Sequence, residues 1–418
     1  MPAILSDNRP SVLLAHPTGN QNLRNALMSL VEHQMLKEFW TTLTWNPEVP
    51  WSRLLPSGMR AQLARRTFAE APGHQIKTVP WREAVRLGAR AEPIARILCS
   101  GERPFSIIGM YRHFDRRVAR RVAQLRPDIV YAYEGGALQS FREAKKHGIT
   151  TVYEQPSGYW HWVRKLFGEE AERKPEYAGL LPNLRDSDGH LEWKDEELDI
   201  ADFVFVPSRH VRNTLLGVVP EEKIRIVRYG APPVREPKQV SLDSCRPLKV
   251  LFAGILIQRK GIGYLLEAIE MLGSQVELTL IGNRFSPNAR VDDACRRCRW
   301  FRTLPHARVL DVMQECDVLV LPSLEEAFGL VVTEALACGV PVIVTPNTGA
   351  GEIIRDGHEG FVVPICRADA IAERLETLHR DREMLAEMSR RAQVTAAKNS
   401  WASYRADWAR ALRSLAWQ

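Results

Sequence analysis

Short runs of β-branched and other apolar residues recur along the chain, and segments with helical apolar spacing separate most of them. Several runs are apolar at successive positions, which is typical of strands buried on both faces of a parallel sheet. The order strand, loop, helix therefore predicts α/β domains with helices covering both faces of each sheet. The predicted strands are 11–16, 128–134, 150–154, 203–208 and 224–230, then 249–254, 276–282, 317–323, 341–345 and 360–364.

The two series of predicted strands are separated by the segment 231–247, which contains four prolines among mixed polar residues. Such a composition interrupts helices and strands, and we interpret it as a linker between two Rossmann-like domains. We predict an N-terminal domain over 1–235, a C-terminal domain over 236–399, and a final helix over 400–418 that packs back across the domains. Ligands bind beyond the carboxyl ends of parallel strands, so the cleft between the domains is the expected site.

The composition is that of a globular protein, with 45% hydrophobic and 26% charged residues in a chain of 418. No run of about 18 or more apolar residues occurs, so we expect no transmembrane helix. The first residues lack a basic region followed by a long apolar core, and seven cysteines are few for this length. These features predict a cytoplasmic protein without a disulfide scaffold.

Arginines are concentrated in 60–68 and 111–126, within a chain whose formal net charge is +7. Two interpretations stay open: a solvated helix face, or peripheral contact with an anionic partner such as a membrane surface. No nucleic-acid-binding motif accompanies the arginines, so we expect no nucleic-acid partner. Cys295 and Cys298 form a single C-x-x-C without a suitably spaced second pair, which predicts packing thiols rather than a zinc site.

The stretch EAFGLVVTE places two carboxylates, Glu326 and Glu334, around an apolar segment. A buried strand precedes the stretch and a helix follows, so the N–H groups of Phe328, Gly329 and Leu330 would lie at a helix N-terminus. Free donors and the helix dipole bind anions there. A phosphate on these donors, with hydroxyls on the two carboxylates, would suit a sugar nucleotide; a capped core helix with two solvent-facing acids is the alternative.

The same stretch resembles the E-x7-E motif of family 4 of the retaining glycosyltransferases, whose members have the GT-B fold. The resemblance continues in order through 323–364 and more loosely through 251–268, whereas the N-terminal half matches mainly in architecture. It implies that Glu334 binds the ribose hydroxyls of the donor and that Glu326 holds hydroxyls of the transferred sugar. It also implies that the backbone at 328–330 approaches the sugar and the phosphate.

The stretch QRKG, after the first strand of the second domain, carries Arg259 and Lys260. A lysine ammonium is a compact charge with three donors and suits a phosphate. The resemblance implies that Lys260 binds the donor diphosphate, while members of the family often have an arginine where this chain has Ile255. Either Arg259 supplies the missing charge or donor binding is weaker; a surface Lys–Arg pair is the alternative.

The N-terminal half offers further candidates on weaker patterns. Gly19 lies where relatives have a glycine-rich turn near the donor phosphate, although an asparagine N-cap explains the same pattern. Relatives place a histidine or an aspartate at the strand end that Glu134 and a tyrosine occupy here. Glu134 would hydrogen-bond the sugar or stabilise developing positive charge, and His16 is another catalytic candidate. At the next strand end, Glu154 and the aromatic residues 159–161 would contact a substrate or form a packed rim.

These observations predict a retaining glycosyltransferase of GT-B architecture, with Glu326, Lys260, Glu134 and His16 as catalytic candidates. A nucleoside diphosphate sugar, linked to UDP or GDP, would bind mainly to the second domain. The acceptor, a glycan, lipid-linked or small molecule, would bind mainly to the first. We expect no cofactor and no metal, because Lys260 and the helix N-terminus would neutralise the diphosphate. The alternatives are an epimerase or hydrolase of the same fold, and a non-enzymatic basic binding protein.

Overall fold

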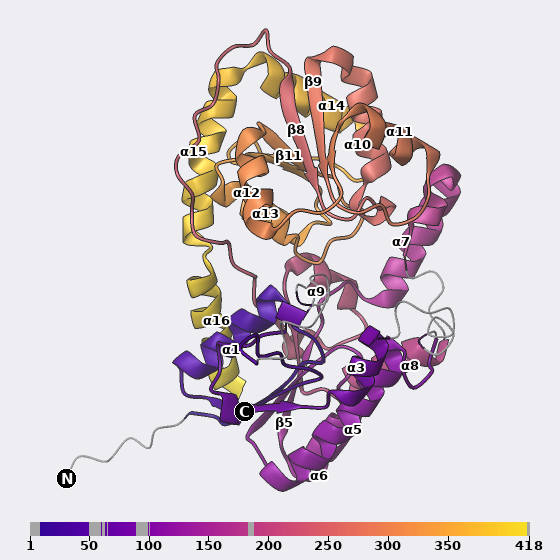
Figure 1. Ribbon diagram of the computed structural model, residues 1–418, viewed down its shortest axis with the longest axis vertical. Coiled ribbons are helices and arrows are strands. Elements are labelled where there is room, and N and C mark those ends of the chain that lie inside the picture. The colour runs from indigo at the N-terminus through magenta and orange to yellow at the C-terminus, as the bar shows by residue number, and fades with distance from the viewer. Residues whose placement is uncertain are drawn as a thin grey trace, which may run out of the picture.

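A computed structural model of the chain describes residues 9–49, 63–64, 66–88, 101–182 and 188–415, with the single positions 60 and 99. Two α/β domains lie one above the other along the long axis of the molecule (Figure 1). The first contains a seven-stranded sheet of order β3-β2-β1-β4-β5-β6-β7, and the second a six-stranded sheet of order β10-β9-β8-β11-β12-β13. All strand pairs in both sheets are parallel, as the successive apolar runs predict.

The strands are short, and those of the first sheet end before β8 begins the second. They are β1 (Val12–Ala15), β2 (Leu36–Thr41), β3 (Ile76–Thr78), β4 (Ile129–Tyr133), β5 (Thr150–Glu154), β6 (Phe203–Val206), β7 (Ile224–Ile226), β8 (Leu248–Ala253), β9 (Val276–Ile281), β10 (Arg299–Phe301), β11 (Val318–Leu321), β12 (Val342–Val344) and β13 (Gly360–Val362).

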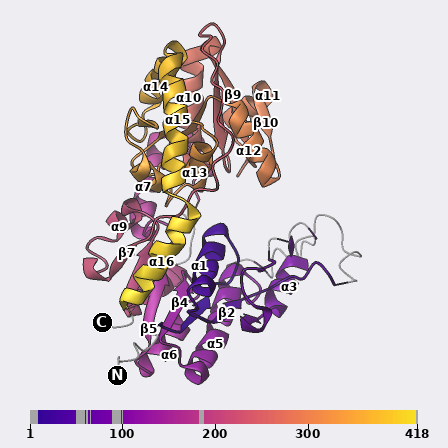
Figure 2. The ribbon, with the colours of Figure 1, turned by 90° about the vertical axis from the view of Figure 1, so that its left-hand side faces the viewer.

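Helices lie on both faces of the two sheets (Figures 1 and 2). The α-helices are α1 (Gln21–Glu32), α3 (Trp81–Gly88), α5 (Ile107–Leu125), α6 (Leu138–Lys146), α7 (Trp160–Arg173), α8 (Asp188–Ile200), α9 (Arg209–Leu215), α10 (Ile262–Leu272), α11 (Ala289–Arg297), α12 (His306–Glu315), α13 (Leu330–Ala337), α14 (Ala368–Arg380), α15 (Arg382–Lys398) and α16 (Trp401–Leu415). Two 3-10 turns near the cleft are η6 (Gln258–Lys260) and η8 (Gly349–Ile353). None of the helices in the described ranges is long and apolar enough to cross a membrane.

All ten predicted strands are present, several of them shorter than predicted, and β2, β3 and β10 were not predicted. Strand β2 was not predicted because charged residues interrupt its apolar run. One of these, Glu38, is accommodated by a salt bridge of 2.6 Å to Arg121 on α5. Strands β3 and β10 have three residues each and lie at the sheet edges, where little burial is needed and the apolar signal is weak.

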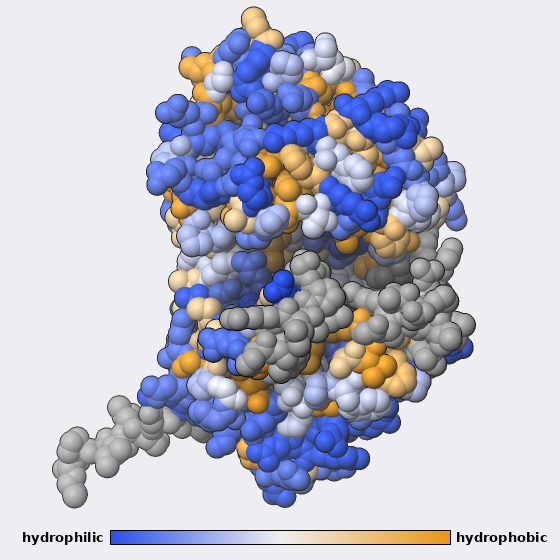
Figure 3. Space-filling view, viewed as in Figure 1, coloured by the Kyte–Doolittle hydropathy of each residue, from blue (hydrophilic) through white to orange (hydrophobic). Residues whose placement is uncertain are grey.

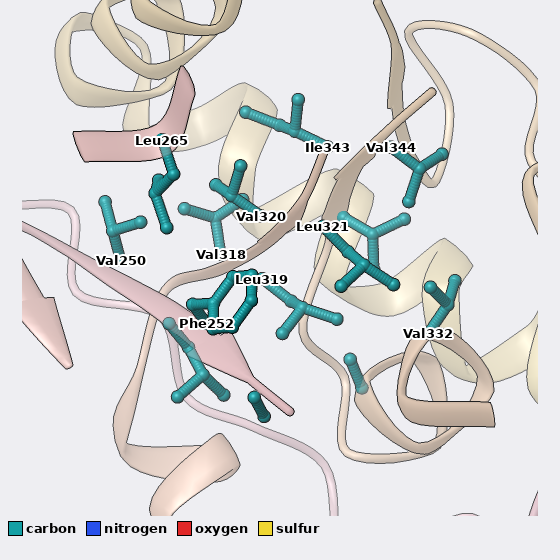
Figure 4. Packing of buried hydrophobic residues seen from close by; sticks show 14 of the residues in the cluster. Val250, Phe252, Leu265, Val318, Leu319, Val320, Leu321, Val332, Ile343 and Val344 are labelled. Carbon is teal, nitrogen blue, oxygen red and sulfur yellow. The ribbon is translucent and has the colours of Figure 1, made fainter. Parts of the chain in front are cut away.

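The core of the second domain forms where β8, β11 and β12 meet the helices (Figure 4). Phe252, Leu319, Val320 and Ile343 are completely buried there. Because apolar side chains project from both faces of these central strands, packing fixes the sheet and the loops at its carboxyl edge. Most candidate residues of the second domain lie on those loops.

Two helices cross between the domains. Helix α7 belongs to the first half of the chain, yet its Val163 and Phe167 join the apolar cluster of the second domain. Its buried Glu170 accepts hydrogen bonds from Gln258 Nε2 at 2.7 Å and from the Tyr264 hydroxyl at 2.9 Å. Helix α16 runs the opposite way, from the second domain down onto the first (Figure 2), where Trp408 packs against a tyrosine of β4.

Candidate functional site

A cavity of about 480 Å³ lies between the two domains. The first domain contributes the loops that follow β4 and β5, including Glu134, Gly158 and Trp160. The second contributes the loops that follow β8 and β11, including Arg259 and Glu326. The lining therefore comes from the carboxyl ends of parallel strands in both sheets, where ligands of this sheet type bind.

The predicted helix after the β11 loop is α13, and Gly329 is its N-cap residue. With φ at 86°, Gly329 has left-handed backbone, which favours a residue without a Cβ. Within the described residues, the N–H groups of Phe328, Gly329 and Leu330 have no hydrogen-bond acceptor, as expected at a helix N-terminus. Phe328 is buried, with 2% of its surface exposed.

A second turn locks the loop that carries Glu326. The Glu326 N–H donates to the Asn347 carbonyl at 2.9 Å, and the Gly349 N–H donates back to the Glu326 carbonyl at 2.9 Å. Ser208 of the first domain donates its hydroxyl to the Ala327 carbonyl at 2.6 Å. A Cβ on Gly349 would lie 2.2 Å from the Ala327 carbonyl oxygen, so this approach requires glycine. The loop is therefore held by both domains.

Glu326 forms an ion pair with Lys260 Nζ, and the Arg259 guanidinium lies 3.9 Å from the same carboxylate. Burial disfavours the charged carboxylate, but these two cations outweigh it and hold the pKa of Glu326 below its usual range. The Lys260 stem runs across Gly254, whose missing Cβ would come within 3.1 Å of Lys260 Cδ. The Glu326 carboxylate is therefore ionised and forms its ion pair with the Lys260 side chain.

Arg259 is directed to a carboxylate that was not predicted as part of the site, Glu325. The Arg259 Nη1 to Glu325 Oε2 distance is 3.1 Å, and Glu325 also accepts the Gly158 N–H of the first domain at 3.1 Å. Burial raises the pKa of Glu325, while Arg259 opposes the shift. A second acid directly before Glu326 was the only sequence signal for this contact between the domains. Ile255, at the position of the absent arginine, is 49% exposed and lines the cavity.

Glu334 lies on α13 with its side chain mostly buried. One of its oxygens is 2.9 Å from His306 Nε2 at the start of α12. This hydrogen bond raises the pKa of His306 despite the opposing effect of partial burial. His306 was not predicted, because it lies 28 residues away in sequence and belongs to no motif.

The first-domain candidates are not all brought to the cavity. Glu134 lines it, and its carboxylate is 3.3 Å from Lys194 Nζ and 3.4 Å from Gln155 Nε2. His16 is buried against the ring of Tyr133, with ring centroids 4.1 Å apart, and burial lowers its pKa to about 3, so the imidazole is neutral.

Gly19 lies in the loop before α1 and is not among the residues that line the cavity. The neighbouring Asn20 caps α1 by accepting the Leu23 N–H at 2.8 Å, so the N-cap interpretation of this loop is correct. A Gly19 contact with a donor phosphate remains a prediction.

Of the candidate residues at and after the end of β5, Glu154 is buried inside the first domain and Trp160 lines the cavity. Glu154 is buried, accepts Asn22 Nδ2 at 3.0 Å and the Tyr229 hydroxyl at 3.2 Å, and has a pKa raised by burial to about 7. Trp160 lines the cavity, and its indole N–H donates to Asp195 at 2.8 Å. Tyr159 is buried in the first domain, so of these two aromatic residues Trp160 is the one in the cavity lining.

His210 at the start of α9 is a further neighbour of the acidic loop that was not predicted. Its backbone N–H donates to Glu352 Oε1 at 3.1 Å, and burial lowers its pKa to about 4, against the attraction of the Glu326 charge. In the sequence, His210 looks like an ordinary residue in the first turn of a helix. Its place beside the acidic loop depends on how the two domains pack together, which the sequence pattern does not reveal.

The described residues contain no group of three or more His, Cys, Asp or Glu side chains placed to hold a metal ion. Cys295 and Cys298 are free thiols that pack against the apolar cluster of the second domain, as predicted.

Comparison with known proteins gives a family match for one domain. Residues 235–395 match the family described as Glycosyl transferases group 1. The uncharacterised glycosyltransferase MJ1178 of Methanocaldococcus jannaschii is 28% identical over 36% of this chain and 44% of its own. Glycogen synthase of Mycobacterium tuberculosis is 30% identical over 56% of each chain. The matches thus span about half the length of these relatives.

The fold comparison covers nearly the whole chain. The structure of HepE from Anabaena, in complex with UDP, superposes with a TM-score of 0.64 and 15% identity, covering 97% of this chain and 100% of that one. The same protein is also known in complex with UDP-glucose. Residues 235–395 therefore match a Glycosyl transferases group 1 domain, and the chain as a whole has the GT-B fold of two facing Rossmann-like domains.

Proposed function

We propose that this protein is a retaining glycosyltransferase that moves a sugar from a nucleoside diphosphate sugar to an acceptor hydroxyl. The observation that carries the proposal is the ion pair of Lys260 with Glu326, which lines the cavity between the domains, next to the N-terminus of α13. A cation, a carboxylate and free N–H donors are the groups needed to hold a diphosphate and a sugar side by side.

Without a donor, Lys260 and Glu326 are paired with each other, and a bound donor would replace each of these partners. The diphosphate would take Lys260 and the N–H groups at Gly329 and Leu330, and the hydroxyls of the transferred sugar would take the carboxylate of Glu326. Glu334 would accept the ribose hydroxyls. Donor binding thus exchanges one buried ion pair for two sets of charge-assisted hydrogen bonds, so neither charge is left uncompensated.

Transfer with retention places bond breaking and bond making on one face of the sugar. The bond between the anomeric carbon and the diphosphate oxygen breaks, and the acceptor oxygen bonds to the same carbon. The acceptor proton passes to the departing diphosphate. Lys260 would stabilise the negative charge that develops there, and Glu134 would stabilise positive charge on the sugar. His16 would contribute as a neutral imidazole, because its pKa is about 3.

We propose a UDP-linked donor, since a structure of the same fold has been determined with UDP-glucose. Lys260, Arg259 and the α13 N-terminus would neutralise its diphosphate without a metal ion. Transfer should therefore continue in excess EDTA; a loss that magnesium or manganese restores would contradict this part of the proposal.

The proposal is tested by incubating the protein with UDP-, GDP-, ADP- and dTDP-sugars, each with and without a panel of acceptors, and measuring release of the nucleoside diphosphate. We expect release that depends on both donor and acceptor and that Glu326→Gln strongly reduces. NMR of the product linkage should show the anomeric configuration of the donor. Turnover of donor alone would indicate an epimerase or a hydrolase, and absence of any donor-dependent stabilisation would indicate a binding protein.

A further inference from the structure

A second hollow, of about 470 Å³, lies on the outer surface of the first domain. Its lining includes three arginines, Arg82, Arg112 and Arg116, and the indole of Trp193. The acid at its edge, Glu102, is paired with Arg112 at 2.7 Å. The hollow therefore has more positive than negative charge among the residues that line it.

The positive charge continues along α5. His113, Arg116, Arg117 and Arg120 follow the spacing i, i+3, i+4, i+7 and so share one face of the helix. The three arginines are exposed, and none of them forms an ion pair with any residue in the described part of the chain. Arg121, on a neighbouring face, is paired with Glu38.

The titration behaviour of neighbouring groups reports this accumulation of like charge. Partial burial lowers the pKa of His113, and four surrounding arginines lower it further. Burial likewise lowers the pKa of Arg82, and Arg116 adds to the shift. Uncompensated positive charge destabilises the folded chain slightly, and an external anion would relieve this repulsion.

Apolar side chains border the arginines on helix α3. Trp81 is 49% exposed and Val85 is 43% exposed, and the two lie one helical turn apart. The indole of Trp81 is 3.3 Å from His113 and packs edge-on against Phe105, with ring centroids 5.6 Å apart. In Figure 3, apolar residues gather just below the grey atoms, where Figure 1 shows α3.

We propose that the α3–α5 face, defined by Trp81, Val85, Arg116, Arg117 and Arg120, docks on the surface of an anionic phospholipid bilayer. The arginines would contact lipid phosphates, and the hollow beside them would receive a headgroup. Exposed tryptophan and aliphatic side chains beside arginines favour a lipid surface over a nucleic acid or an acidic protein, because they gain by entering the interface between headgroups and acyl chains.

The face is connected to the cleft through helix α8. Arg112, at the hollow, lies 4.6 Å above the ring of Trp193, and the adjacent Lys194 lines the cleft. Docking would therefore place Trp193, the neighbour of a residue in the cleft lining, beside the leaflet. Resting on the proposed glycosyl transfer, this placement suits a lipid-linked acceptor, and the exposed apolar residues Ile255 and Phe285 in the cleft lining agree with it.

The test is co-sedimentation of the full chain with vesicles of phosphatidylcholine alone and with vesicles containing phosphatidylglycerol. We expect binding to the anionic vesicles only, weakened when salt rises from about 0.15 M to about 0.5 M. Each arginine near an anionic leaflet contributes about fivefold to binding. The variant Arg116→Gln/Arg117→Gln/Arg120→Gln should therefore partition about a hundredfold more weakly.

The control removes three arginines from α14 and α15 of the second domain, each paired with a glutamate of its own helix, as Arg380→Gln/Arg390→Gln/Arg391→Gln. It has the same net charge as the α5 variant and should bind vesicles nearly as well as the unmodified chain. Trp81→Ala should also weaken vesicle binding but leave binding to soluble heparin unchanged.

Equal loss in the α5 variant and the control would refute a specific face, and so would binding to heparin without binding to vesicles. All variants should bind UDP like the unmodified chain. Failure of UDP binding in the unmodified chain would count against the proposed function and not against the docking face.

Discussion

Replacement of Lys260 by methionine isolates the charge of the ion pair at the cleft while keeping the length of the side chain. Glu326 would keep its buried position and lose its nearest cation, with Arg259 remaining 3.9 Å away. Removing one partner of a buried pair costs about 3–5 kcal/mol, because a charge is left without compensation. Both side chains here are 13% exposed and Arg259 compensates in part, so we expect about 3 kcal/mol.

The companion variant Glu326→Gln removes the stranded charge and keeps the shape. In that background Lys260→Met no longer leaves a carboxylate alone and should cost about 1 kcal/mol or less, which gives a coupling of about 2 kcal/mol. Urea unfolding followed by circular dichroism at pH 7.5 measures all four proteins. Because the pKa of Glu326 is lowered in the folded chain, the pair stabilises it fully above the ordinary glutamate value of 4.5 and loses its effect as pH falls below that value.

The cost of Lys260→Met should therefore shrink in acid as well as in the Glu326→Gln background. Equal costs in the two backgrounds, or a cost below about 0.5 kcal/mol in the unmodified chain, would show that the two side chains are not energetically coupled. Lys260 and Glu326 would then be close to each other without stabilising each other. The proposal that a donor replaces their ion pair would no longer be supported.

Three further results are expected. Glu334→Gln should weaken UDP binding about ten- to a hundredfold in calorimetry, since a hydrogen bond to a charged group contributes about 1.5–3 kcal/mol, whereas Glu326→Gln should reduce turnover more than UDP affinity. Glu154→Gln should flatten the decline of stability as pH rises from 4.5 to about 7, because burial raises the pKa of Glu154 from 4.5 to about 7 and in that interval the unfolded chain has lost a proton that the folded chain still holds. Gly254→Ala should press on the lysine of the ion pair and lower UDP affinity, whereas Gly273→Ala, at another positive φ but in open space, should leave that affinity unchanged.

Much of the fold could be predicted from the sequence, because parallel strands that are buried on both faces are apolar at successive positions. The same rule fails where tertiary contacts replace local pattern. Glu38 stands in a strand because Arg121 from a distant helix neutralises it, and no window along the chain contains both residues.

The candidate site follows the same division. Glu326, Glu334 and Lys260 could be selected because they belong to two short motifs, EAFGLVVTE and QRKG, each of which follows a predicted strand. His306, His210 and the partner carboxylate of Arg259 could not be selected, because their roles arise only when separate elements meet. Roles for Gly19, Glu134 and His16 remain predictions, and burial restricts His16 to neutral chemistry.

The exchange of α7 and α16 between the domains has a consequence for the history of such chains. Suppose that a gene rearrangement joined the first half of this chain to the second half of a relative within 236–247. Helix α7 would then lose the core that receives Val163 and Phe167, and the new α16 would not match the first-domain surface on which it packs. Each half would expose an apolar surface matched only to its former companion. We therefore expect the two halves of this chain to be inherited together, and new specificity to arise more readily from changes in the loops at the cleft than from exchange of a half.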